Sequence, residues 1–185
     1  MNVVDYKVSN IKISGSITVD YTILLSNGME KKLRVSSLET AHEDFYKALI
    51  DIKECFYQMI GFPIADAVTG EKLQVYVRKI TFVNKTNCGR GMKITAAVDG
   101  IANHSDLTVL TTLPFYEKGT GITTIVTKDG TKDIFYQQLT QFQFDAMENM
   151  AKEAFAFAHY NKKEQPTLEE AAEGYFAEQG SLIDG

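Results

Sequence analysis

The stretch VSNIKISGSITVDYTILLSNGMEKKLRV, residues 8–35, decides the fold. Apolar and polar residues alternate over Val8–Ser14 and again over Ile17–Leu25, which is typical of half-buried antiparallel strands. The Asn-Gly pair at 27–28 tolerates the positive φ of a tight hairpin turn, and it leads into a third strand over Lys31–Val35. This stretch therefore predicts three consecutive antiparallel strands.

A helix is predicted directly after these strands. Thr40 with Glu43 has the spacing of a capping box, and Ser36 with Glu39 offers a second start. Apolar residues then recur at helical spacing: Phe45, Leu49, Ile52, Phe56 and Met59. The Gly-Phe-Pro run at 61–63 is predicted to end the helix, because glycine suits the position after a helix and proline cannot continue it.

The same order of elements recurs later in the chain. Strands are predicted over Leu73–Val83, Met92–Val98 and Asp106–Leu113, and a small hairpin over Ile122–Thr127 and Lys132–Phe135. A long amphipathic helix is predicted from about Ile134 to Tyr160. The order is thus strand-strand-strand-helix followed by strand-strand-strand-hairpin-helix, which suggests an internal duplication.

Three strands and one helix bury only one face of a sheet, so two such units can complete a core together. The expected fold is α+β: an antiparallel sheet with two helices on one side, arranged as an internal duplication of a strand-strand-strand-helix unit. We expect one domain over residues 1–163, with halves of about 1–65 and 70–163, and an acidic, partly flexible C-terminal tail over 164–185. The sheet face opposite the helices is then either exposed to solvent or functional.

The composition is that of a globular protein. Its 185 residues, 44% of them hydrophobic, suit one domain and exclude collagen-like, low-complexity and disordered classes for most of the chain. No apolar run approaches the ~20 residues of a membrane span, and the polar start resembles no signal peptide. Two cysteines exclude a disulfide framework, and a reduced cytoplasm is the expected setting.

The charge distribution is uneven. Six basic side chains and no acidic one occur between Lys72 and Val98, whereas residues 164–185 carry six acidic and no basic side chains in a protein of net charge −5. Tyr76 and Phe82 lie in the same predicted strand as several of the cations. Cations that follow a nucleic-acid backbone, beside rings that stack on bases, are what a single-strand-binding surface needs. The predicted nucleic-acid-binding residues are Lys72, Arg78, Lys79, Lys85, Arg90 and Lys93.

A structurally neutral interpretation of the same residues stays open. Strict alternation places Arg78 and Lys79 on opposite faces of their strand, and it places Tyr76 and Phe82 on the face of Ile80. On that interpretation the rings belong to the core and the cations only solubilise the protein. The acidic tail likewise has two interpretations: a solubilising terminus, or a functional segment that occupies the basic groove until a phosphate backbone displaces it or that binds a host or phage protein partner.

The sequence shows no catalytic signature. Nucleotide-binding glycine motifs, the G-x-S-x-G nucleophile motif and the H-E-x-x-H zinc motif do not occur. Asp99, His104 and Asp106 are close in sequence, but their spacing fits no metal-ligand pattern. Cys55 is expected to be a small buried hydrophobe, and no activating base stands near Cys88. We therefore expect no catalysis, no cofactor and no metal.

Residues 8–35 and the stretches VRKITFVNKTNCGRGMKITAAVDG, residues 77–100, and LTVLTTLPF, residues 107–115, resemble uncharacterised early-region proteins of bacteriophages and prophages of gut bacteria, encoded beside replication and recombination genes. The resemblance extends over roughly residues 3–160. The resemblance implies a non-catalytic accessory role in the host cytoplasm. Together with the charges it gives the hypothesis of a phage accessory protein that binds nucleic acid, single-stranded DNA above all. The alternative is an inhibitor of a host defence system that binds a protein or a small ligand. Either role is compatible with a homo-oligomer.

Overall fold

The computed structural model describes residues 2–60, 74–85, 89–99, 109–116, 121–127, 130–136 and 138–163. Its strands and helices follow one another as β1 (Val3–Ile13), β2 (Ile17–Leu25), β3 (Glu30–Ser37), α1 (Glu43–Ile60), β4 (Gln74–Lys85), β5 (Gly89–Asp99), β6 (Val109–Tyr116), β7 (Gly121–Thr127), β8 (Gly130–Tyr136) and α2 (Gln141–His159). The predicted acidic tail, residues 164–185, lies outside the described residues and stays a prediction.

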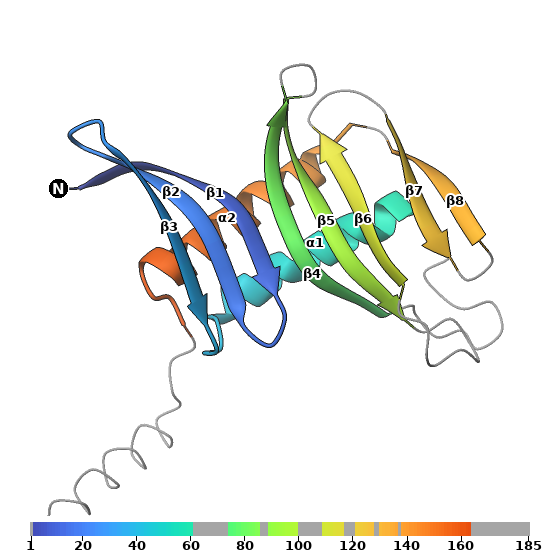
Figure 1. Ribbon diagram of the computed structural model, residues 1–185, viewed down its shortest axis with the longest axis horizontal. Coiled ribbons are helices and arrows are strands. Elements are labelled where there is room, and N and C mark those ends of the chain that lie inside the picture. The colour runs from blue at the N-terminus through green and yellow to red at the C-terminus, as the bar shows by residue number, and fades with distance from the viewer. Residues whose placement is uncertain are drawn as a thin grey trace, which may run out of the picture.

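The first six strands form one antiparallel sheet in the order β3-β2-β1-β4-β5-β6, and β7 pairs with β8 in a second small sheet. Both helices lie side by side behind the larger sheet and run across its strands (Figure 1). The predicted α+β class, with an antiparallel sheet and two helices on one side, is confirmed. Neither helix of the described chain is both long and apolar enough to cross a membrane.

The alternation of residues in β2 shows how the sheet forms two chemically different faces. Ile17, Val19, Tyr21 and Ile23 are buried beneath the helices, whereas the residues between them are only half-buried. Val8 and Ile11 of β1 are also buried, and a bulge between Val8 and Asn10 absorbs the extra residue. The apolar face packs on α1 and α2, and the polar face is directed away from them.

The helix starts differ from the sequence prediction. The expected Thr40 capping box is wrong, because α1 begins at Glu43 and the His42 Nδ1 accepts the Asp44 N–H at 3.3 Å. The expected start of the second helix at Ile134 is also wrong.

Helix α2 begins at Gln141 because Thr140 and Gln143 form a reciprocal capping box. Thr140 Oγ1 accepts the Gln143 N–H at 3.2 Å, and Gln143 Oε1 accepts the Thr140 N–H at 3.0 Å. Ile134, seven residues earlier in the chain than Gln141, instead belongs to β8. The T-x-x-Q spacing is the sequence signal that marks this start.

The internal duplication is not confirmed. The strand order is symmetric about the β1–β4 pair: β1 and β4 are the first strands of their halves, and the later strands of each half follow outward from them. However, β7 and β8 have no counterpart before α1. The junction between the two predicted halves, at about residues 66–69, falls within residues 61–73, which lie outside the described residues.

The core lies between the apolar sheet face and the two helices, and it contains residues from both halves. Its largest fully buried side chains are Phe45, Phe56, Phe157, Ile11, Ile52, Ile80, Met92, Ile94, Met147 and Met150. Phe45 of α1 and Phe157 of α2 pack with their ring centroids 5.8 Å apart. One continuous cluster of apolar side chains therefore connects the helices to the sheet.

Cys55 gives a direct test of this core. It is fully buried in α1, and this burial raises the pKa of its thiol to about 12. Because only the thiolate reacts readily, we expect Cys55 in a Cys88→Ser variant to resist a thiol-specific reagent at pH 8 until the protein is unfolded. Absorbance of the released chromophore, with and without denaturant, measures this. Rapid labelling of the folded protein would contradict the packing of α1.

Candidate nucleic-acid interface

Two lysines face each other at the centre of the polar sheet face. Lys12 of β1 lies directly opposite Lys79 of β4 in the antiparallel register, and Thr18 of β2 lies opposite Lys12 on the other side. Residues directly opposite in an antiparallel pair present their side chains on the same face. The two ammonium groups therefore share the face that points away from the helices.

A bulge in β4 brings Lys79 to this face. Val77 lies opposite Ala96 and Lys79 lies opposite Thr95, so Arg78 is the extra residue of the bulge. Strict alternation would have put Lys79 on the face of the buried Val77. The predicted division of β4 into two faces is therefore wrong beyond the bulge.

The side chains on either side of the bulge confirm the switch. Val75 and Val77 are buried before it, and Ile80 is buried after it. Tyr76 is 45% exposed, with the Arg78 guanidinium carbon 5.8 Å from the centroid of its ring. Thus Tyr76 is not a core residue, in contrast to one of the two interpretations of the sequence.

Three further lysines lie on the same face. Lys93 of β5 is opposite Thr81, whose hydroxyl donates to Asn10 Oδ1 of β1 at 2.9 Å. Lys7 of β1 and Lys32 of β3 lie on either side of Thr22. We call the set Lys7, Lys12, Lys32, Lys79 and Lys93 the lysine face. Sequence reasoning missed its members in β1 and β3, although each is a polar position in an alternating strand.

Among the described side chains, acidic residues on this side of the sheet are fewer than basic ones. Asp20 of β2 is held by Arg34 of β3, whose Nη2 donates to Asp20 Oδ2 at 3.1 Å. This hydrogen bond holds the pKa of the Asp20 carboxyl below its usual range, and the charges of Lys12 and Lys79 lower it further. Asp5 and Glu30 share the far end of the face, across Leu24. The centre of the lysine face thus remains positive.

Arg90, one of the predicted cations, does not join the lysine face. Arg90 forms an ion pair with Glu148 of α2, and its guanidinium carbon is 5.2 Å from the centroid of the Phe144 ring. Both partners belong to the helix side, so the expectation that all six cations converge is wrong for Arg90. Lys85 is the last residue of β4, and its side chain, like all of Lys72, lies outside what the structure describes.

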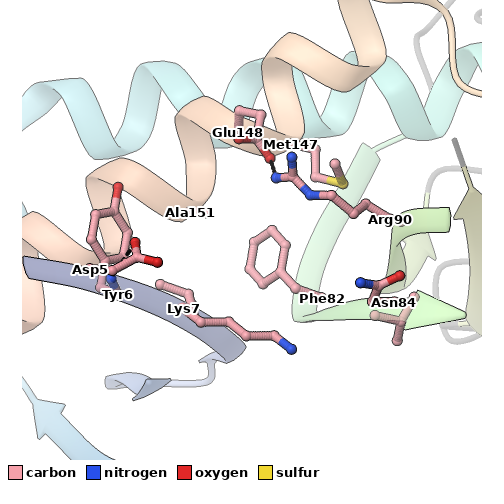
Figure 2. Close-up of a pocket in the computed structure, with 12 residues that line it drawn as sticks. Asp5, Tyr6, Lys7, Phe82, Asn84, Arg90, Met147, Glu148 and Ala151 are labelled. Atoms are coloured by element: carbon pink, nitrogen blue, oxygen red, sulfur yellow. Dashed lines mark hydrogen bonds and ion pairs between the residues drawn. The ribbon is translucent and has the colours of Figure 1, made fainter. Parts of the chain in front are cut away.

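A cavity opens beside the lysine face because β1 and β4 separate. They pair only through Asn10–Lys12 and Lys79–Thr81, and beyond these residues the strands diverge (Figure 1). The gap forms a cavity of about 530 Å³ between β1, β4, β5 and α2. In Figure 2 the Phe82 ring and the Asn84 amide lie on one side of it, with Lys7 and Tyr6 on the other.

No metal site emerges from the described residues, where no three His, Cys, Asp or Glu side chains are grouped to bind an ion. Asp99 ends β5, while His104 and Asp106 lie in the segment 100–108 that the structure does not describe. Searches with this chain found no matching family model, no matching curated protein and no matching solved structure.

Proposed function

We propose that this chain is a non-catalytic phage accessory protein that binds single-stranded nucleic acid, DNA above all, on its lysine face during replication or recombination. The phage setting rests on the resemblance of residues 8–35 and 77–100. The binding surface rests on one observation, the placement of Lys12 directly opposite Lys79 at the centre of an exposed polar sheet face.

This placement has an energetic cost that a ligand can offset. Like charges directly opposite in a sheet are destabilising. Among the described residues, neither Lys12 nor Lys79 has a carboxylate within ion-pair distance, and Asp20 is already bound by Arg34. A phosphate group between the two ammonium groups would replace their repulsion with two attractive contacts. A polyanion is the ligand that repeats this contact along the face.

The form of the surface favours a single strand. Tyr76 is 45% exposed at the end of the face near the bulge, and the Arg78 guanidinium carbon, 5.8 Å from the centroid of its ring, leaves that exposure in place. An accessible aromatic ring stacks on an unpaired base but not on a base inside a duplex. Threonine and asparagine side chains between the lysines, including Thr81 and Asn10, offer neutral hydrogen-bonding groups to the same strand.

Fluorescence anisotropy with a labelled 20-nucleotide oligothymidine tests the proposal. If the five lysines of the lysine face contact phosphates, log Kd should rise with log salt concentration with a slope of about 3.5. A duplex of the same length is the comparison and should bind more weakly. Absence of binding at low salt, or binding that is indifferent to salt, would contradict the proposed function.

A further inference from the structure

We infer that the cavity between β1 and β4 binds one nucleobase of the strand held on the lysine face. The inference rests on the proposed function and assigns a role to a part of the fold that the lysines do not explain. At the cavity, β1 and β4 of the larger sheet are not paired with each other: the unpaired segments are Val3–Ser9 of β1 and Phe82–Lys85 of β4.

The cavity suits a small planar ligand in size and position. A volume of about 530 Å³ lies within the range of ~300–1,000 Å³ that is usual for small-molecule sites. Lys7 belongs both to the lysine face and to the cavity wall. A base that leaves a strand bound on the outer face can therefore enter without losing the phosphate contacts on either side of it.

The lining offers both kinds of contact that a base requires. The Phe82 ring projects into the space in Figure 2, and Met147 and Ala151 of α2 add apolar surface. Asn84 is exposed at the cavity, and its side chain makes no hydrogen bond to another described residue. Its amide presents one donor group and one acceptor, which is the pattern needed to pair with the polar edge of a base.

The Arg90–Glu148 ion pair fixes the inner wall of the cavity. It connects the start of β5 to α2, and Figure 2 shows it above the Phe82 ring. Because the Arg90 guanidinium already contacts a carboxylate and the Phe144 ring, it supports the wall. Arg90, predicted from the sequence as a phosphate contact, is thus placed beside the base instead.

The test compares a 20-nucleotide strand with a strand of the same length that carries abasic sites at its centre. The wild-type protein should prefer the complete strand, and the preference should fall by roughly tenfold in Phe82→Leu. Asn84→Ala, at an exposed position, should reduce the preference as well. Phe142→Leu, an exposed aromatic at the start of α2 outside the cavity, is the matched control and should keep it.

The outcomes separate this inference from the proposed function. Salt-sensitive binding of both strands, with the same preference in wild type, Phe82→Leu and Asn84→Ala, overturns the cavity assignment alone. That result is also what a cavity that takes an extended peptide strand would give. If neither strand binds, the proposed function fails first. A second titration uses thymidine 5′-monophosphate, and binding of it tighter than that of the strand would make a free nucleotide the occupant and overturn the inference.

Discussion

Replacement of both Lys12 and Lys79 by glutamate is expected to weaken the binding of single-stranded DNA by about 100-fold or more. The two side chains lie directly opposite at the centre of the lysine face, so the variant sets two carboxylates against the phosphate backbone beside Asp20. Like-charge juxtaposition at an interface costs several kcal/mol. Anisotropy at fixed ionic strength measures the effect, and the slope against salt should fall in the same experiment.

A matched variant separates this local effect from the change in net charge. Lys53→Glu with Lys152→Glu alters the total charge equally, but both residues lie on the helices, on the other side of the sheet. Its affinity should stay within a few-fold of wild type. Equal losses in the two variants would show that overall charge alone determines binding.

A single neutral replacement, Lys79→Gln, is expected to raise stability and to weaken DNA binding at the same time. Lys79→Gln removes the repulsion across β1 and β4, so the free energy of unfolding should rise by roughly 0.2–1 kcal/mol while DNA binding weakens. Urea denaturation and anisotropy on the same preparation check both changes. A lysine that only solubilises the protein would show the gain in stability without any loss of binding.

The fold was largely predictable because alternation in the strands is a strong local signal. The predicted range Ile17–Leu25 coincides with β2, where every second residue from Ile17 to Ile23 is buried. The sequence also contained the Thr140–Gln143 capping box, yet the apolar periodicity of Ile134 and Phe135 drew the predicted helix start too far back. Those residues belong to β8, where pairing with β7 determines their conformation.

The candidate site was predictable only in part, because it depends on pairing between distant segments. Lys79 and Lys93 were identified from the sequence, but Lys12 gains its importance only from its position opposite Lys79. The bulge after Val77 reverses the face of every following residue in β4, and no glycine or proline marks it. The ion pair that draws Arg90 to α2 joins residues 58 positions apart. Local patterns carry none of this information.

The same junction that aligns the lysines also connects the two halves of the core. Ile11 of β1 lies opposite Ile80 of β4, one residue from the Lys12–Lys79 pair, and both isoleucines are completely buried. Ile80 also lies opposite Ile94 of β5. Because β1 and β4 pair at only a few residues, much of their association depends on this apolar contact.

Ile80→Ala is therefore expected to lower the free energy of unfolding by roughly 2–5 kcal/mol, through lost burial and the cavity left behind. Urea denaturation followed by circular dichroism measures it, and Val4→Ala, at a position 59% exposed, should cost less than about 0.5 kcal/mol. A core shared by both halves also requires one cooperative transition in wild type and variant alike. Two separate transitions, with only the later one affected by Ile80→Ala, would mean that the halves fold independently. The β1–β4 contact that aligns Lys12 with Lys79 would then contribute little to stability.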